Sequence, residues 1–401
     1  MRILMISDTY FPRISGVATS IRSFRQGLEQ LGHQVDLLVP DYDSSTGDDP
    51  GIVRIPSRKI RLYPEERLMQ PRTLLRSRAK LAARQYDVLH IQTPFVAHYL
   101  GNHLARRLKL PVISSYHTYF EAYLGHYYGK IPTRIRQAMV RIPSRQQCAA
   151  VDGLIVPSQA MAAVLRNYGV NTPIQVIPTG IRLSPQPHPA EQRVCFRKRH
   201  EIAEHRPVLL YAGRIAPEKN IGLLLSMLRQ LRQQRPDVLL LLAGDGPARP
   251  SLEKEARDTQ LTDHVRFLGY LDHLLELPQA YAAADLLVFA SETETQGMVL
   301  LEALAAGLPV VAVPVMGAAD LLHSGMGTRS APADAGAFAR ICADILADPN
   351  LLEQLSTEAR NLAHQWSENI MVTKLADFYL DVIAQKNTVR ATGFVDKHKS
   401  H

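Results

Sequence analysis

The 401-residue sequence is 46% hydrophobic and 21% charged, which is typical of a globular protein with two or three domains. Its net charge of +8 favours anionic partners such as a nucleotide, nucleic acid or acidic lipid, although no nucleic-acid-binding motif is evident. No apolar run of 18 residues predicts a transmembrane helix, and no signal peptide precedes the first expected strand. The scattered Cys148, Cys195 and Cys342 disfavour a disulfide framework or a zinc site and favour a reducing cytosol.

The first half of the chain predicts an open, mostly parallel α/β sheet. Short apolar runs predict strands at 2–7, 34–40, 53–56, 87–92, 112–116, 152–157 and 174–177. Helical periodicity predicts helices at 17–31, 71–85 and 131–150, and two more that end at Leu108 and Tyr168. In such a sheet, ligands bind at the carboxyl ends of the strands.

A glycine-containing loop follows the first strand. Pro12 and Gly16 mark this loop, and the helical pattern begins at Val17. A glycine loop that opens a helix after the first strand is suited to hold a phosphate. The pattern is not the G-x-G-x-x-G fingerprint, so a Rossmann dehydrogenase is excluded; an ordinary βα turn is the alternative.

Two basic helices in the first half are candidates for contact with anionic lipid. The first carries Arg72, Arg76, Arg78, Lys80 and Arg84 and no acidic residue. The second carries Arg134, Arg136, Arg141 and Arg145. A basic amphipathic helix is typical of a membrane-surface element. A helix packed on the core with a solvated basic face is equally consistent with the pattern.

His117 follows the strand at 112–116, at the sheet edge where Gly16 is also expected. A lone histidine is more often structural than catalytic, but this position favours a functional role. Tyr119 and Tyr123 belong to an aromatic band that follows it. Such a band suits either a membrane interface or packing beneath the ligand-binding edge.

A proline-rich stretch at 178–189 separates the two halves, and we place the domain boundary between residues 185 and 186. The second half predicts strands at 207–212, 238–243, 265–268, 285–290 and 308–313. Strand signals are weak after Pro314. Helices are expected at 298–306, 335–347, 351–363 and 366–384, followed by a disordered polar tail at 386–401.

The segment 213–220 reads G-R-I-A-P-E-K-N and follows the first strand of the second half. Arg214 offers a forked contact and Lys219 a point charge, and together these cations fit a diphosphate. A surface loop with salt bridges is the alternative.

The segment 289–312 contains strand, loop, helix and strand in succession. Free N–H groups at the helix start near Gly297 are suited to bind phosphate. Glu294 lies in the loop and Glu302 lies about two turns into the helix, so they are not one tight dyad. Carboxylates beside a phosphate site suit sugar hydroxyls, because each can accept two O–H bonds. A helix with one stray glutamate is the alternative.

These motifs resemble those of the family 4 retaining glycosyltransferases. Glu294-x7-Glu302, the following A-L-A-A-G-L-P-V-V-A and the G-R-x-x-x-E-K-N segment are similar to the family signature. E-T-Q-G at 294–297 and H-T-Y-F-E-A-Y from His117 resemble the bacterial diacylglycerol glycosyltransferases, except that Phe120 replaces a tyrosine.

The resemblance implies a GT-B fold, with two Rossmann-like doubly wound α/β domains facing a central cleft. Residues 1–185 would bind the acceptor and residues 186–365 the nucleotide sugar. A helix at 366–385 would cross back to the first domain.

The resemblance also implies roles for individual residues. The expected catalytic residues are His117, Glu294, Arg214 and Lys219. The expected nucleotide-sugar-binding residues are Gly16, Val17, Arg214, Lys219, Gly246, Leu268, Glu294, Thr295, Gln296, Gly297, Met298, Val299 and Glu302. The expected acceptor or membrane contacts are Arg72, Arg76, Lys80, Tyr119, Tyr123 and Arg134.

The implied function is transfer of a hexose, with UDP-glucose favoured, to the hydroxyl of diacylglycerol at the cytoplasmic membrane face. A saccharide or lipid-linked oligosaccharide is the alternative acceptor, and a non-catalytic nucleotide-sugar-binding protein is a third interpretation. We expect an anionic membrane surface as partner, no nucleic acid, and no protein-bound metal or cofactor.

Overall fold

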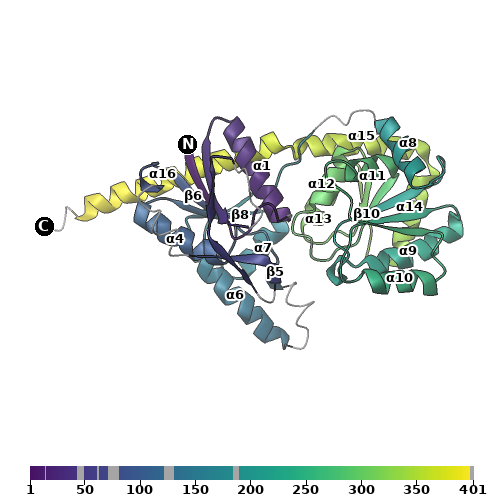
Figure 1. Cartoon of the computed structure of the whole chain (residues 1–401), viewed down its shortest axis with the longest axis horizontal. Helices are drawn as coiled ribbons and strands as arrows, with labels where there is room; N and C mark the ends of the chain where they lie inside the picture. The colour runs from purple at the N-terminus through teal and green to yellow at the C-terminus, as the bar shows by residue number, and fades with distance from the viewer. Residues whose placement is uncertain are drawn as a thin grey trace. The chain divides into compact units, whose positions relative to one another are not determined.

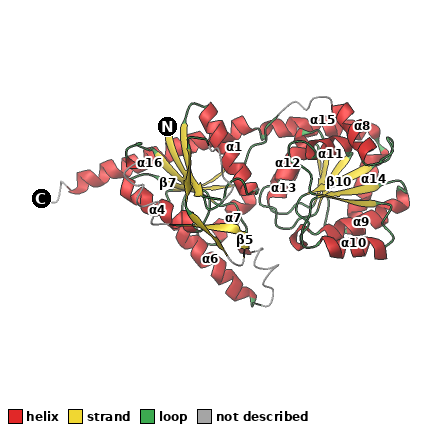
Figure 2. Cartoon of the chain, viewed as in Figure 1, coloured by secondary structure: helices red, strands yellow, loops and turns green. Residues whose placement is uncertain are grey.

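The computed structural model describes residues 1–13, 15–42, 49–60, 63–70, 81–121, 131–183 and 189–397. The chain divides into two compact units. The first contains Met1–Thr118, Ile131–Gly180 and the chain from Glu368 onward, and the second consists mainly of Ile181–Ser367. Each unit is a parallel sheet flanked by helices (Figure 2). The boundary expected between residues 185 and 186 lies outside the described residues.

The first unit contains a seven-stranded parallel sheet in the order β3-β2-β1-β6-β7-β8-β9. Its strands are β1 (Arg2–Ile6), β2 (Gln34–Pro40), β3 (Ile52–Ile55), β6 (Val88–Ile91), β7 (Val112–Ser115), β8 (Gly153–Val156) and β9 (Ile174–Val176). The central strands are buried along almost their whole length. Helices cover both faces of a parallel sheet, so its strands read as continuous apolar runs, which the sequence displays.

Within the described ranges, helices of this unit flank the sheet (Figure 1). They are α1 (Gly16–Gln30), α4 (Val96–Leu108), α6 (Thr133–Ala149), α7 (Gln159–Asn167) and α16 (Glu368–Lys397). Ser15 and Ser158 start α1 and α7, because each hydroxyl accepts a backbone N–H from the first turn. The expected helix at 71–85 lies almost entirely outside the described residues.

The last helix, α16, belongs to the first unit. Val372 and Tyr379 are buried in the same core as Phe24 of α1. Gly27 permits the close contact of α1 with α16, since a Cβ at Gly27 would lie 2.4 Å from Val372 Cγ2. The helix expected at 366–385 corresponds to α16, which packs in the first unit.

The expected disordered tail at 386–401 is wrong over most of its length, because α16 continues to Lys397. The prediction relied on the polar composition of this segment. Because 386–397 contains no proline, nothing in its sequence ends the helix there. The antiparallel hairpin of β4 (Ser57–Ile60) and β5 (Tyr63–Met69) was also not predicted.

The second unit contains a six-stranded parallel sheet in the order β12-β11-β10-β13-β14-β15. Its strands are β10 (Val208–Ala212), β11 (Leu239–Ala243), β12 (Val265–Gly269), β13 (Leu286–Phe289), β14 (Val310–Ala312) and β15 (Thr328–Ser330). The edge strand β15 was not predicted because it is short and its sequence, T-R-S, is polar.

The helices of the second unit pack against this sheet around a large apolar core. They are α8 (Pro189–Arg199), η1 (Pro217–Lys219), α9 (Ile221–Gln234), α10 (Arg249–Asp258), α11 (Leu277–Ala283), α12 (Met298–Ala305), α13 (Gly317–Leu322), α14 (Ala335–Ala347) and α15 (Pro349–Gln365). The expected helices at 298–306, 335–347 and 351–363 correspond to α12, α14 and α15, whereas α8, α10, α11 and α13 were not predicted.

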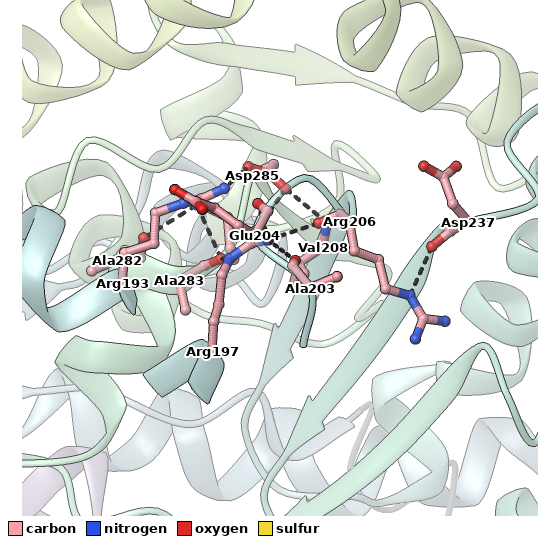
Figure 3. A network of polar contacts seen from close by, with 11 residues as sticks. Arg193, Arg197, Ala203, Glu204, Arg206, Val208, Asp237, Ala282, Ala283 and Asp285 are labelled. Atoms are coloured by element: carbon pink, nitrogen blue, oxygen red, sulfur yellow. Dashed lines mark hydrogen bonds and ion pairs between the residues drawn. The ribbon is translucent and has the colours of Figure 1, made fainter. Parts of the chain in front are cut away.

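A polar network ties α8 to the sheet (Figure 3). Arg197 is 2% exposed and donates to the Asp285 carboxylate at 3.2 Å. Its guanidinium also donates to the carbonyl oxygens of Ala203, Glu204, Arg206 and Ala283. Arg193 donates to the other Asp285 oxygen at 2.8 Å, and the Val208 N–H donates to Asp285 at 2.7 Å. The network fixes the beginnings of β10 and β13, at the edge opposite their carboxyl ends.

Candidate functional site

The carboxyl ends of β10 and β13 bring Lys219 and Glu294 together in the second unit. Lys219 ends η1, which follows β10, and Glu294 lies in the loop after β13. Because these strands are neighbours in the sheet, residues far apart in sequence meet at its edge. Lys219 Nζ lies 2.7 Å from Glu294 Oε2, and each side chain is about one-fifth exposed (19% and 21%). The pair is therefore partly shielded but accessible to a ligand.

The loop that carries Glu294 leads directly into α12. Gly297 precedes the helix with φ = +89°, a left-handed conformation that favours glycine. Its N–H donates to Glu294 Oε1 at 3.3 Å, and the Gly317 N–H donates to the Glu294 carbonyl at 2.7 Å. Gly297 has no side chain to cap the helix, so the N–H groups of Met298 and Val299 are available to an anion.

Glu302 lies farther along α12 and contacts different groups from Glu294. Its Oε1 lies 2.9 Å from His273 Nε2, and its Oε2 accepts a hydrogen bond from the Tyr281 hydroxyl at 2.8 Å. The two glutamates thus occupy separate positions on the site, as their sequence spacing predicts.

Glycines hold the loops after β10 and β11 close together. Gly246 has φ = +158°, and a Cβ there would lie 2.3 Å from the Ile215 carbonyl oxygen. The Ile215 N–H in turn donates to the Asp245 carbonyl at 2.9 Å. Beside them, the Gly244 N–H donates to the Gly269 carbonyl at 2.7 Å, directly after Leu268 of β12. The loops after β10, β11 and β12 are therefore joined to one another by backbone hydrogen bonds.

Three other predicted donor-site residues lie at the same edge. Arg214 is exposed, and its carbonyl accepts a hydrogen bond from the buried Tyr211 hydroxyl at 3.0 Å. Burial, followed by the charge of Glu294, raises the pKa of Tyr211, so this hydroxyl remains a donor. Gln296 is buried, and Thr295 is partly exposed beside Gly317.

The first unit holds three further predicted site residues, Gly16, Val17 and His117. Gly16 is the first residue of α1, followed by Val17, and a Cβ at Gly16 would meet no atom within 4 Å. The glycine is therefore not required by packing. His117 follows β7, and burial lowers its pKa to about 4, so the imidazole is neutral at pH 7.

Sequence reasoning missed Asp8, which follows β1 and is 6% exposed. It accepts hydrogen bonds from the Thr93 hydroxyl at 2.7 Å and the Ala97 N–H at 3.0 Å. Burial nevertheless raises its pKa to about 6. The sequence did contain one indication of its role, because an acidic residue directly after the first strand lies at the ligand-binding edge of the sheet. His273 and Tyr281 were also missed, although His273 lies just beyond the expected strand at 265–268.

The expected membrane contacts are only partly described. Arg72, Arg76, Lys80 and Tyr123 lie outside the described residues, and Tyr119 is partly exposed. Arg134 is exposed on α6. The same helix exposes Ile135, Met139 and Ile142, each by more than half (53%, 55% and 52%). Their i, i+4, i+7 spacing places them on one face.

Comparison with known proteins agrees with the fold and the motifs. Residues 14–185 match the model of Glycosyltransferase Family 4, and residues 193–362 match that of Glycosyl transferases group 1. Alpha-monoglucosyldiacylglycerol synthase of Streptococcus pneumoniae is 35% identical over 96% of this chain and 87% of the relative. The synthase of the same name from Acholeplasma laidlawii is 31% identical over 78% of this chain and 80% of the relative.

Solved structures show the same architecture. Sucrose-phosphate synthase from Thermosynechococcus elongatus superposes with a TM-score of 0.75 at 23% identity, covering 96% of this chain and 99% of that one. HepE from Anabaena, in complex with UDP, gives 0.72 at 18% identity, covering 95% and 100%. The chain therefore belongs to glycosyltransferase family 4 and is a hexosyltransferase with the GT-B fold.

Proposed function

We propose that this enzyme transfers glucose from UDP-glucose to the free hydroxyl of diacylglycerol, with retention of the anomeric configuration. The single observation that carries the donor site is the Lys219–Glu294 pair beside the start of α12. A cation, a carboxylate and free helix N–H groups together match a diphosphate attached to a polyhydroxyl sugar.

The reaction requires that the departing diphosphate be stabilised as it gains negative charge. Lys219, Arg214 and the first-turn N–H groups of α12 supply fixed positive groups for it. Glu294 accepts hydrogen bonds from sugar hydroxyls while Lys219 turns toward the phosphate. A nucleotide leaving group needs no protonating acid, so we propose same-face attack assisted by the diphosphate, without a protein-bound metal or cofactor.

His117 has a separate proposed role in the first unit. As a neutral imidazole it can both donate and accept a hydrogen bond, which suits a sugar hydroxyl near the reacting carbon. Neutrality also avoids placing a positive charge beside an anomeric carbon that becomes electron-poor in the transition state.

The lipid acceptor is supported by α6. Ile135, Met139 and Ile142 form its exposed apolar face, and Arg134 and Arg145 are exposed on the same helix. A helix of this kind lies in the interface of an anionic bilayer. Among the described residues, no helix has the length and hydropathy to cross a bilayer. We therefore propose peripheral attachment at the cytoplasmic membrane face, in agreement with the glycolipid-synthase names of the relatives.

The test is a donor-by-acceptor assay with radiolabelled UDP-glucose, GDP-mannose and UDP-glucuronic acid, and diacylglycerol in anionic vesicles. We expect label from UDP-glucose in the organic phase and an α-linked product by NMR. If no donor labels lipid but one is hydrolysed, the acceptor proposal fails and saccharides or lipid-linked oligosaccharides are tested next. If no donor is consumed, the whole proposal fails.

Variants connect the assay to the site. Lys219→Met and Glu294→Gln should each lower kcat by about 10²–10³-fold, the usual effect of removing one electrostatic group from such a site. Lys254→Met is the matched control, because Lys254 forms an exposed pair with Asp258 on α10. Unchanged kcat in the first two variants would contradict the assignment.

Membrane attachment has its own test, which is sedimentation with anionic vesicles. Replacing Ile135, Met139 and Ile142 together by serine should abolish co-sedimentation. Leu380→Ser is the control, because Leu380 is 52% exposed on α16 of the same unit. Equal loss in both proteins would assign the effect to general surface hydropathy rather than to α6.

A further inference from the structure

A cavity opens between α4 and α6 in the first unit, at the amino ends of β7 and β8. Its volume is about 630 Å³, and Val112 and Val151 are among the residues that line it. A cavity of this size is within the range of small-molecule sites. His117 follows β7 at the opposite edge of the sheet, so the cavity is separate from the site described above.

Two buried polar side chains of α4 line this cavity. His98 and Asn102 are 4% and 9% exposed, and they occupy the buried face of the helix, where apolar residues are expected. Asn102 Nδ2 donates to the His98 carbonyl at 3.0 Å and lies 3.2 Å from His98 Nε2. Within the described ranges, no protein group pairs with Asn102 Oδ1 or His98 Nδ1, and neither atom is sealed from solvent.

These two atoms present one acceptor and one donor of hydrogen bonds. Burial lowers the pKa of His98 to about 4, so its imidazole is neutral at pH 7 and carries a single N–H. Asn102 Nδ2 can only donate, which makes His98 Nε2 the acceptor and places the hydrogen on Nδ1. An amide oxygen and an imidazole N–H together suit a ligand hydroxyl, which both donates and accepts.

Three cations line the same cavity, namely Arg106, Lys109 and Lys386. Lys386 Nζ lies 2.5 Å from Asp152 Oδ1, the one carboxylate in the lining. The Arg106 guanidinium is exposed and has no partner in the part of the chain that the structure describes. The ends of α4 and α6 add about half a negative charge each, so the cavity keeps about one positive charge, which favours an anion.

The polar pair and the cations are arranged in line along α4. His98, Asn102 and Arg106 follow one another at intervals of four residues, which places them on one face and about 6 Å apart along the helix. Basic residues at helix ends often serve only to offset the dipole. That role does not explain a histidine and an asparagine buried beside them.

From these groups we infer that the cavity is a second ligand site, which binds a small phosphate ester that carries hydroxyl groups. The phosphate would lie at Arg106, and a hydroxyl at Asn102 Oδ1 and His98 Nδ1. The same chemistry occurs in free sugar or glycerol phosphates and in hydroxylated phospholipid head groups, and the experiment distinguishes these two sources. The inference does not depend on the donor or acceptor proposed above.

Isothermal titration calorimetry of the full chain tests the site with three probes. They are glycerol phosphate, inorganic phosphate, and dihexanoyl-phosphatidylglycerol below its micelle concentration. Arg106→Gln should weaken glycerol phosphate by about tenfold or more, because a hydrogen bond to a charged group is lost. Arg107→Gln is the matched control: Arg107 is the exposed neighbour on α4 that does not line the cavity, so the affinity should change by less than about twofold.

Asn102→Leu tests the hydroxyl contact. Leucine has a similar size but no amide oxygen, so glycerol phosphate should bind about threefold to tenfold more weakly. Inorganic phosphate, which has no alcohol hydroxyl, should change by less than about twofold. Arg106→Gln alters an exposed side chain and keeps the site testable even where Asn102→Leu prevents folding.

Several outcomes would overturn the inference. They are binding of none of the probes, equal weakening by Arg106→Gln and Arg107→Gln, and equal weakening of both phosphates by Asn102→Leu. Lys219→Met is titrated in parallel, because the cations of the donor site could also hold a phosphate. Loss of binding in Lys219→Met but not in Arg106→Gln would place the ligand at the donor site and overturn the inference.

The relative affinities identify the source of the ligand. Arg106-dependent binding of glycerol phosphate at least as tight as that of the short-chain lipid would support a soluble ester. Arg106-dependent binding of the lipid alone would support a phospholipid head group. These titrations use neither donor nor acceptor, so a failure of sugar transfer would overturn the proposed function and leave this result unchanged.

Discussion

Replacing Arg197 by methionine should destabilise the second unit without changing its donor site. Methionine retains an apolar stem of similar length but none of the five hydrogen bonds that the guanidinium donates. Four backbone carbonyls and the Asp285 carboxylate would each lose a donor. The site lies at the other end of β13, so the geometry around Glu294 should persist.

The magnitude follows from the burial of the network. Removing one partner of a buried, hydrogen-bonded ion pair typically costs about 3–5 kcal/mol. Asp285 keeps Arg193 at 2.8 Å and the Val208 N–H at 2.7 Å, which partly compensates its charge. We therefore expect the lower value, about 3 kcal/mol, which for a unit of this size lowers Tm by about 6–12 °C.

The single tryptophan makes the assay specific. Trp366 packs against the core of the second unit, so its fluorescence during heating reports the unfolding of that unit. Lys254→Gln, which breaks an exposed pair, should shift Tm by no more than about 2 °C. At 20 °C the KM of Arg197→Met for the donor should equal that of the parent protein. A Tm shift of Arg197→Met as small as that of Lys254→Gln, or a raised donor KM of Arg197→Met, would refute this account of the network.

Three further predictions concern single residues. Gly246→Ala should raise the donor KM, because its Cβ would lie 2.3 Å from the Ile215 carbonyl oxygen and separate the two loops; steady-state kinetics measures this. Asp8 has a folded pKa of about 6 against the usual 3.8, so the folded state holds its proton more tightly; relative to Asp8→Asn, stability should fall by about 2 kcal/mol between pH 4.5 and 7 by calorimetry. His117, with a pKa of about 4, stays neutral above pH 5, so His117→Gln should lower kcat without changing the shape of the pH profile between pH 5 and 8.

The sequence predicted the strands well because a parallel sheet covered on both faces buries every side chain of its central strands. L-L-L-L-A in β11 and D-L-L-V-F-A around β13 are short continuous apolar runs, which is the pattern expected of fully buried strands. The meeting of Lys219 with Glu294 also follows, since both lie just after strands of one sheet and ligand-binding residues gather at the carboxyl edge.

The remaining contacts depend on tertiary structure that local patterns do not encode. Arg193 and Arg197 look like exposed residues of a basic helix, and only the position of α8 beside Asp285 buries Arg197 and partly covers Arg193. His273 lies in an exposed loop with no periodicity, and its partner Glu302 is 29 residues away. The hairpin of β4 and β5 is short and rich in charged residues, so neither propensity nor burial predicts it.

The position of α16 has a consequence for synthesis of the chain. The core of the first unit includes Met371, Val372, Leu375 and Tyr379, which are made after the whole second unit. During synthesis on the ribosome, all residues of the second unit are made before α16. Until α16 is made, β1 and α1 keep part of their apolar surface uncovered. The half that begins the polypeptide is thus the half that finishes folding last, and truncation near the carboxyl terminus would damage the amino-terminal unit.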